Sequence, residues 1–287
     1  MLVGLMCVRN EDWCLGLTLR AAAQWCDLVV VLLHACTDLS QEIAMQVASE
    51  EPGKIIVVSD DRPLWDEMRH RQAMLEIART YDATHIAMID ADEILTADQT
   101  ARIRMLIQHM PADACMQLPG YNLRHGREKY HANGIWGLRW FSFAFRDRPD
   151  LMWEGDRFHH REPHGGRPLM PYRPIAQHHG GVMHLWGISE RRLAAKHALY
   201  KLTERLRWPD RKVSDIEEMY GWWKHDRPPV TPAQWSFVSV PPTWWDGYRD
   251  LLCYLCPQRT PWQEAECRRI VEDHPGIEQG LDLFGVL

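Results

Sequence analysis

The chain has 287 residues, of which 46% are hydrophobic and 25% are charged. This composition is ordinary for a folded globular protein and excludes a chain that is disordered throughout. The 33 Lys and Arg residues are outnumbered by 39 Asp and Glu residues, which gives a net charge of -6. A negative total charge excludes a global basic field that would recruit nucleic acid, so any site for a polyanion must be local.

The first apolar run, in MLVGLMCVRNE, meets Arg9 too early to be a signal-peptide core or a membrane span. No other apolar run reaches spanning length, so we expect a cytoplasmic protein without a membrane span. Eight cysteines are few for a chain of this length, and most lie in apolar surroundings where thiols act as small hydrophobic groups. Near the C-terminus, a group of three cysteines and one histidine could form a zinc site or could pack between helices, and both interpretations stay open. These residues are Cys253, Cys256, Cys267 and His274.

The first 110 residues alternate between strand-like and helix-like patterns. Four continuous apolar runs predict strands that are buried on both faces, at residues 2–8, 28–35, 54–59 and 85–90. Between them lie segments that are apolar at spacings of three and four and predict helices, at residues 11–26, 40–50 and 64–81. Strands that alternate with helices indicate right-handed crossovers and a parallel sheet.

Helix boundaries can also be predicted in this half. Asn10 and Ser40 stand where helix N-caps are expected, and Pro52-Gly53 should end the second helix. Ligands of parallel α/β sheets bind outside the carboxyl ends of the strands. Polar residues follow all four predicted strands at this edge: Arg9, Asn10 and Glu11; Thr37 and Asp38; Asp60 and Asp61; Asp90, Asp92 and Glu93.

The rest of the chain has a different character. Residues 111–185 contain shorter strand-like pieces, and residues 121–180 hold ten Lys or Arg against six Asp or Glu, a local charge of +4. This stretch could hold phosphate groups. A helix is predicted from Ser189 to about Leu206, because Pro209 follows. The last segment is rich in Trp and Pro, and includes Trp222, Trp223, Trp244 and Trp245.

The acidic cluster DADE follows the fourth predicted strand. Asp90 and Asp92 lie two residues apart in an extended segment, so their side chains point the same way. Three carboxylates this close repel each other unless a cation sits among them or some hold protons. A hard divalent ion such as Mg2+ or Mn2+ would relieve the repulsion and could also bind substrate phosphates. The alternative is a solvated strand end, with Glu93 leading into a helix near Thr96.

The order of these pieces, from Arg9-Asn10-Glu11 to ATHIAMIDADEIL, resembles a GT-A fold glycosyltransferase of the family 2 type, best over residues 1–110. The resemblance implies that Asp90 faces the ribose or the metal and that Asp92 is a metal ligand. It also implies which residues would contact the nucleotide-sugar donor. Arg9, Asn10, Glu11, Asp60 and Asp61 would line the nucleoside pocket, and Arg71 would approach the base or the diphosphate.

A second part of the resemblance lies in GVMHLWGISERRLAAKHALYK. There His184 corresponds to a histidine that reaches the metal, and a helix with basic residues follows it. Lys196 and Tyr200 lie four residues apart on one face of this helix, so both could approach the donor phosphates. The alternatives are a buried core histidine at 184 and a solvated helix face at Lys196.

Glycosyl transfer with inversion also needs a base near the acceptor hydroxyl. The stretch WEGDRFHHREPHG, residues 153–165, offers Asp156 first and Glu154 second for this role. The alternative is a loop whose acids form salt bridges with Arg157 and Arg161.

Taken together, the sequence predicts a mixed, mainly parallel α/β sheet of the Rossmann-like GT-A class, flanked by helices and followed by a helical C-terminal extension. Residues 1–110 would bind the nucleotide sugar, residues 111–206 would complete the metal and acceptor half, and residues 207–287 would form the extension. The predicted activity is Mn2+- or Mg2+-dependent transfer of a sugar, from a UDP-sugar donor, to a saccharide or small hydroxylated molecule. Two alternatives stay open: transfer to a hydroxylated base of DNA, and nucleotidyl transfer.

Overall fold

The structure, a computed structural model, describes residues 1–62, 64–134, 136–137, 139–155, 160–220 and 235–287. Contacts within the chain divide it into two compact units that interleave in sequence. Unit 1 comprises residues 1–121, 139–185 and 241–256, and unit 2 comprises residues 122–138, 186–240 and 257–287. The division predicted from the sequence has three consecutive segments, with boundaries near residues 110 and 206, and it stays a prediction.

Unit 1 is built on a sheet in which four neighbouring strands are parallel, in the order β3-β2-β1-β4. These strands are β1 (Leu2–Val8), β2 (Leu28–His34), β3 (Ile55–Asp60) and β4 (His85–Asp90). Their bounds agree with the predicted strands to within one residue. Every residue of β2 is buried, which explains why the strand has no alternating polar face.

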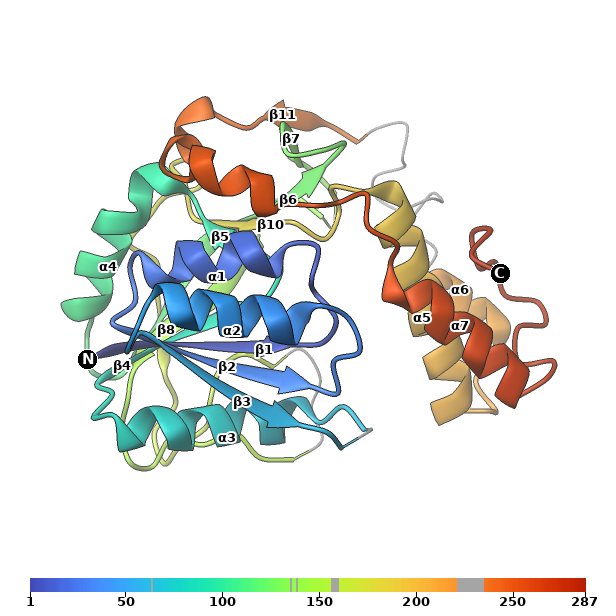
Figure 1. Ribbon diagram of the computed structural model, residues 1–287, viewed down its shortest axis with the longest axis horizontal. Coiled ribbons are helices and arrows are strands. Elements are labelled where there is room, and N and C mark those ends of the chain that lie inside the picture. Colours follow the sequence, from blue (N-terminus) through green and yellow to red (C-terminus); the bar gives the residue numbers. More distant parts are fainter. Residues whose placement is uncertain (63, 135, 138, 156–159, 221–234) are drawn as a thin grey trace. The chain divides into compact units, whose positions relative to one another are not determined.

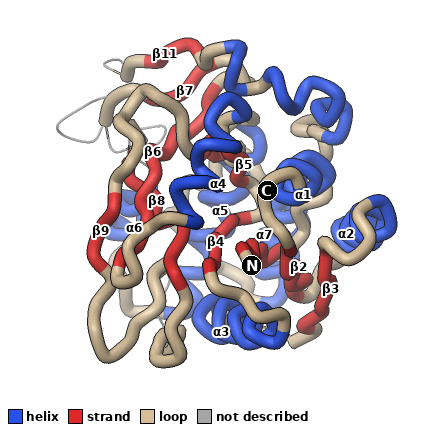
Figure 2. The backbone as a smooth tube through the Cα atoms, turned by 90° about the vertical axis from the view of Figure 1, so that its left-hand side faces the viewer, coloured by secondary structure: helices blue, strands red, loops and turns tan. Residues whose placement is uncertain are grey.

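Helices cover both faces of this parallel region, because alternate strand residues point to opposite sides. Helices α1 (Leu15–Ala23), α2 (Ser40–Glu50) and α4 (Thr100–Gln108) pack on the face that includes Met6 and Val31. Helix α3 (Glu67–Thr80) packs on the opposite face, against Leu5 and Val30. Figure 1 shows α1 and α2 on one side of strands β1–β3 and α3 on the other, and Figure 2 shows α3 and α1 on opposite sides of β2 and β4.

The sheet of unit 1 continues with antiparallel strands beyond β4. Strand β8 (Arg139–Arg146) pairs antiparallel with both β4 and β6 (Ala114–Arg124), and β9 (Met170–Tyr172) pairs parallel with β6. A short antiparallel pair, β5 (Glu93–Leu95) with β10 (Val182–His184), lies directly after β4 in the chain and brings in a segment almost 90 residues later in sequence. The predicted fold class, a mixed and mainly parallel α/β sheet flanked by helices, is confirmed.

Part of the predicted C-terminal extension belongs to unit 1. The segment 241–256, which contains the short 3-10 helices η3 (Pro242–Trp244) and η4 (Asp246–Tyr254), packs against α1 and η1 (Ala97–Gln99). The Trp244 ring lies 4.4 Å from the Tyr121 ring, and the Tyr248 hydroxyl lies 3.2 Å from Oγ1 of Thr100. The Trp-rich tail therefore contributes core aromatics to the sheet unit, as large aromatic residues usually do.

Unit 2 contains the helices α5 (Glu190–Arg207), α6 (Val213–Tyr220) and α7 (Trp262–Asp273), with the short strands β7 (Lys129–His131) and β11 (Phe237–Ser239). Lys201 of α5 is fully buried, and its ammonium donates to Oε2 of Glu217 at 2.7 Å and to the Asp282 carbonyl at 2.8 Å. Trp222 and Trp223 lie outside the described residues. Across the described ranges, the helices all fall short of the length and apolarity that crossing a membrane requires.

The two predicted N-caps are wrong. Helix α1 begins only at Leu15, and Asn10 has a left-handed backbone with φ of 56°. Its Oδ1 accepts hydrogen bonds from the Thr37 amide at 2.7 Å and the Asp38 amide at 3.3 Å. Ser40 is the first residue of α2, and its hydroxyl accepts from the Glu11 amide at 2.9 Å. These side chains tie the loops after β1 and β2 together, because loop amides there have no ladder partner.

Three buried histidines make the stability of the fold depend on pH. Burial lowers the pKa of His70, His131 and His197 from 6.5 to about 4. Between these values the unfolded chain binds more protons than the folded chain, so stability is complete above pH 6.5 and falls as the pH drops toward 4. We expect the free energy of unfolding to be lower at pH 5 than at pH 7.5 by about 2 kcal/mol per histidine. Urea unfolding at the two pH values measures this difference.

A matched pair of variants checks the cause of this pH dependence. In His197→Gln, the free energy of unfolding should fall less between pH 7.5 and pH 5 than in the unaltered protein. In His274→Gln, which changes an exposed histidine, it should fall as much as in the unaltered protein. Equal stability of the unaltered protein at both pH values would contradict the prediction.

Candidate functional site

The acidic turn at the end of β4 is the centre of the candidate site. Strand β4 ends at Asp90 and β5 begins at Glu93, so Ala91 and Asp92 form the link between them. Asp90 stands opposite Cys7 of the neighbouring parallel strand β1, at the carboxyl edge of the sheet. Ligands of such sheets bind at this edge.

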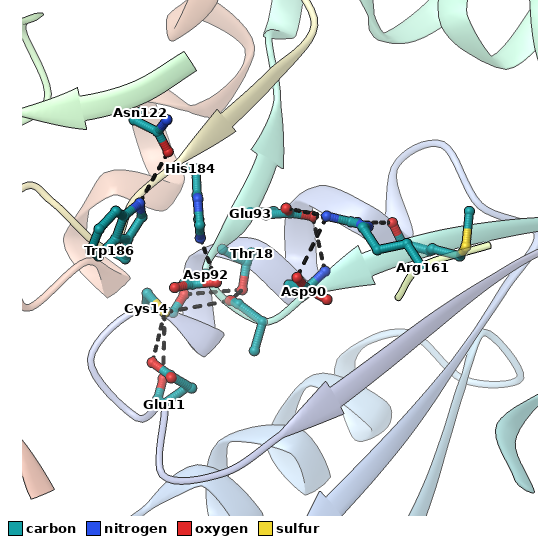
Figure 3. Close-up of polar contacts among 12 residues, drawn as sticks. Glu11, Cys14, Thr18, Asp90, Asp92, Glu93, Asn122, Arg161, His184 and Trp186 are labelled. Carbon is teal, nitrogen blue, oxygen red and sulfur yellow. Dashed lines mark hydrogen bonds and ion pairs between the residues drawn. The ribbon is translucent and has the colours of Figure 1, made fainter. Parts of the chain in front are cut away.

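Asp92 and His184 meet in this turn. Strand β10 pairs antiparallel with β5 so that His184 stands opposite Glu93, and the Leu185 amide donates to the Asp92 carbonyl at 2.8 Å. Nε2 of His184 lies 3.3 Å from Oδ1 of Asp92, and the His184 side chain is 20% exposed. Figure 3 shows the imidazole directed at the Asp92 carboxylate. The predicted pair is therefore adjacent, although its residues are distant in sequence.

Glu93 is held by an arginine. Its side chain is 1% exposed, and Arg161 donates to its two oxygens at 2.5 and 2.7 Å. The same guanidinium donates to the Met88 carbonyl at 2.6 Å and lies 3.5 Å from Oδ2 of Asp90. Arg161 therefore neutralises much of the charge in the acidic turn, for which the sequence predicted a divalent ion or protonated carboxylates.

Asp90 lies between two guanidiniums. Arg71 of α3 contacts Oδ1 of Asp90 at 3.4 Å, and it donates to Glu67, one helical turn earlier, at 2.9 and 3.0 Å. Burial raises the pKa of the Asp90 carboxyl, but the charges of Arg161 and Arg71 lower it by more, so that the pKa lies below its usual value. Asp90 is therefore ionised at neutral pH and remains 42% exposed.

The loop after β1 carries three predicted donor-binding residues. Arg9 lies beside His34 of β2, with 3.5 Å between its Nη1 and the imidazole Nδ1. Oε2 of Glu11 accepts from the Trp13 indole at 2.5 Å, and Asn10 is engaged by the loop after β2. Arg9 and Glu11 are partly exposed at the carboxyl edge of the sheet, whereas Asn10 is buried.

The end of β3 is occupied by a charge network. Asp60 accepts hydrogen bonds from Arg62 at 2.9 Å and Arg69 at 2.7 Å, and it lies 3.2 Å from Nε2 of His70. Burial raises the pKa of Asp60, but hydrogen bonds from Arg62 lower it by more, so the net shift is downward. Asp61 is exposed. The Asp60 carboxylate thus has cationic partners within the protein.

The remaining predicted residues belong to unit 2, to an exposed position of unit 1 or to the stretch outside the described residues. Lys196 and Tyr200 belong to α5 of unit 2, where the Lys196 ammonium lies 5.5 Å from the Trp186 ring and the Tyr200 ring lies 5.6 Å from the Tyr220 ring. Glu154 is exposed in unit 1, and Asp156 lies outside the described residues. The roles of these residues stay predictions.

The cysteine set is divided between the two units. Cys253 and Cys256 belong to unit 1, while Cys267 and His274 belong to unit 2. Cys267 is fully buried in an apolar cluster with Leu202 and Ile270, and burial raises the pKa of its thiol to about 12. A buried thiol of this kind behaves as a small hydrophobic group, which agrees with the helix-packing interpretation for Cys267.

Asp92 and His184 fit a divalent metal as a two-residue ligand set. Neighbouring ligands of an octahedral ion with bonds of about 2.1 Å lie about 3 Å apart, close to the observed 3.3 Å. Within the described ranges, no group of three His, Cys, Asp or Glu side chains is placed to hold a metal ion. Two protein ligands suffice where phosphates and waters complete the shell, and an imidazole favours Mn2+ over Mg2+.

Sequence reasoning missed four residues that contribute to this site: Arg161, Thr18, Cys14 and Glu67. Arg161 was considered only as a salt-bridge partner within its own loop, and no motif signals its contact with Glu93. Thr18 and Cys14 of the α1 region hydrogen-bond to the Ala91 carbonyl, a contact between residues more than 70 positions apart. Only the i,i+4 pair of Glu67 and Arg71 could have been recognised, from its helical spacing.

Comparison with known proteins gives structural matches alone. No protein-family model matches the chain, and no curated protein matches it. The crystal structure of S. aureus TarS 1-349 is 11% identical, with a TM-score of 0.44 over 95% of this chain and 88% of that chain. Its UDP complex is 13% identical, with a TM-score of 0.38 over 50% of this chain and 46% of that chain.

A third match is glucosyl-3-phosphoglycerate synthase from Mycobacterium tuberculosis, in complex with Mn2+, UDP and phosphoglyceric acid. It is 15% identical, with a TM-score of 0.30 over 44% of each chain. In this match and in that to the TarS–UDP complex, the chain spans less than half of the solved protein. Likenesses at this level carry no argument about activity, which therefore depends on the site residues themselves.

Proposed function

We propose that this chain is a metal-dependent glycosyltransferase of the GT-A type that moves a sugar from a nucleoside diphosphate donor to a hydroxyl acceptor. The observation that carries this proposal is the adjacency of Asp92 and His184 at the carboxyl edge of a β3-β2-β1-β4 sheet. A carboxylate and an imidazole that meet at this edge of a parallel sheet suit a site for a metal and a diphosphate. The donor we propose is a UDP-sugar.

Different residues of the chain would bind the metal, the ribose and the nucleoside. Asp92 and His184 would hold Mn2+ or Mg2+, and the bound ion would neutralise the charge that develops on the leaving diphosphate. Asp90, ionised beside Arg71, faces the same edge and would orient the ribose or the metal. The partly exposed side chains of Arg9 and Glu11 and the exposed side chain of Asp61 would surround the nucleoside.

Inversion at the sugar carbon requires a carboxylate that takes the proton of the acceptor hydroxyl. We propose that Asp156 or Glu154 is this base, because both acids stand in the sequence stretch 153–165 that also contains Arg161, the arginine that holds Glu93 of the acidic turn. The acceptor we propose is a saccharide or a small hydroxylated molecule.

A donor screen tests the proposed function. The protein is incubated with individual nucleotide sugars and Mn2+, and slow hydrolysis of the donor is followed through release of the nucleoside diphosphate. We expect release from one class of nucleotide sugar, and loss of release when EDTA removes the metal. Release of pyrophosphate from nucleoside triphosphates, with no release from nucleotide sugars, would instead establish a nucleotidyltransferase.

A further inference from the structure

The backbone of the acidic turn is anchored by helix α1. The Ala91 carbonyl, between Asp90 and Asp92, accepts a hydrogen bond from Oγ1 of Thr18 at 2.7 Å and contacts Sγ of Cys14 at 3.4 Å. Thr18 is 1% exposed and Cys14 is fully buried. In Figure 3, Thr18 and Cys14 lie near Asp92, to the left of Arg161. Helix α1 therefore supports the turn from within the protein.

These contacts fix the peptide group that precedes Asp92. A peptide group is planar, so holding the Ala91 carbonyl also orients the Asp92 amide and Cα. The next peptide group is held as well, because the Asp92 carbonyl accepts from the Leu185 amide at 2.8 Å. Asp92 is thus fixed on both sides, by α1 and by the segment that carries His184. The spacing between its carboxylate and the imidazole follows from these two anchors.

The Thr18 hydroxyl has a hydrogen-bond acceptor outside its own helix. A threonine within a helix usually donates back to the carbonyl four residues earlier, which here is that of Cys14 at 3.3 Å. The Ala91 carbonyl is closer, at 2.7 Å, and a hydroxyl has only one proton to donate. The proton therefore goes to Ala91, since leaving that buried carbonyl without its main donor would be costly.

Cys14 extends the same link toward the loop after β1. Its Sγ lies 3.7 Å from the Glu11 carbonyl and 3.9 Å from Oε2 of Glu11, as well as 3.4 Å from the Ala91 carbonyl. One buried thiol thus contacts both the proposed nucleoside loop and the proposed metal turn. A shift of α1 would move these two parts together.

We propose that Thr18 is a positioning residue that sets the affinity of the Asp92 and His184 pair for its metal ion, with Cys14 in a lesser supporting role. This inference rests on the proposed function, because it assumes that the pair binds a divalent ion. Residues that orient metal ligands from behind commonly change metal affinity by about 10- to 100-fold when they are replaced. Thr18 touches neither the metal nor the donor and acts only through the Ala91–Asp92 peptide.

The test measures Mn2+ binding directly, in the presence of UDP, from the electron paramagnetic resonance signal of free Mn2+. Thr18→Val removes the hydroxyl while keeping the side-chain shape, and we expect about 10-fold weaker binding or more. Thr18→Ser keeps the hydroxyl and should bind as the unaltered protein does. Thr100→Val is the matched control, because it removes a partly buried hydroxyl that contacts the Thr96 carbonyl and Tyr248 instead.

Two further measurements separate positioning from loss of folding. Thermal unfolding should show similar losses for the valine variants at 18 and 100, while only the variant at 18 loses Mn2+ affinity. Hydrogen exchange without metal should be faster across residues 90–93 in Thr18→Val alone. If Thr18→Val does not fold, Cys14→Ala is measured in its place, and we expect its Mn2+ binding to be weaker than that of the unaltered protein and of Thr100→Val.

The outcomes distinguish this inference from the proposed function. If the unaltered protein binds no Mn2+ with UDP, both are overturned. If the unaltered protein binds Mn2+ and Thr18→Val binds it equally well, with unchanged exchange at 90–93, only the role of Thr18 is overturned. Equal weakening in Thr18→Val and Thr100→Val would also overturn it, since the effect would then be general loss of stability.

Discussion

Replacing Asp92 by alanine is expected to lower metal-dependent release of nucleoside diphosphate by at least about 100-fold. The change removes one of the two groups that we propose as protein ligands of the metal, and leaves His184 without the carboxylate 3.3 Å away. Asp92 is buried, so its carboxylate is held in the turn where the ion would bind. The measurement is the rate of donor hydrolysis over a range of Mn2+ concentrations, together with Mn2+ binding itself.

The control for Asp92→Ala is Asp98→Ala. Asp98 is an exposed carboxylate six residues further along the chain, in η1, and its contact with the Thr243 hydroxyl at 3.3 Å is peripheral. This variant should retain the activity of the unaltered protein. Asp92→Asn keeps the side-chain shape but removes the charge, and should lose activity as alanine does. Full activity in either variant at position 92 would end the metal proposal.

Arg161→Gln is expected to lower the free energy of unfolding by about 3 to 5 kcal/mol, since it leaves the buried Glu93 carboxylate without its cation. Glu93 is 1% exposed and receives two hydrogen bonds from Arg161. Burial already raises the pKa of Glu93 against the opposing charge of Arg161. Without that charge the carboxylate must take up a proton or remain buried and unpaired. Urea unfolding at pH 7.5 measures the loss.

Two companion variants identify the source of this loss. Combining Arg161→Gln with Glu93→Gln should recover most of the stability, because removing both members of a buried pair costs less than removing one. Arg173→Gln changes an exposed arginine that donates to Gln117 at 2.8 Å, and should alter stability by no more than about 0.5 kcal/mol. A single Arg161→Gln variant as stable as the unaltered protein would show that Glu93 needs no charged partner.

The fold of the first half could be predicted because its information is local. The apolar runs that become β1 to β4 lack polar positions, as strands buried on both faces must, and the helices between them repeat apolar residues at spacings of three and four. The same reasoning placed Asp90 and Asp92 at the carboxyl edge of the sheet. Helix starts were less predictable, since the Asn10 side chain accepts a hydrogen bond from the loop after β2 and does not cap a helix.

The partners of the acidic turn were harder to foresee. His184 could be suggested only through the resemblance to GT-A enzymes, and its contact with Asp92 depends on pairing between β5 and β10. The role of Arg161 carried no sequence signal, because any loop arginine can form a surface salt bridge. The reasoning that three close carboxylates require a cation was sound, but for Glu93 and Asp90 that cation is a guanidinium of the chain itself.

The parallel α/β core and the edge at which its acids gather could be predicted, because hydrophobic periodicity and strand direction are properties of short segments. The contacts made at that edge depend on how distant segments fold together: His184 with Asp92, Arg161 with Glu93, and the Thr18 hydroxyl with the Ala91 carbonyl. Each of these contacts joins residues at least 68 positions apart. Their energies depend on burial and on distances of about 3 Å, which sequence spacing does not encode.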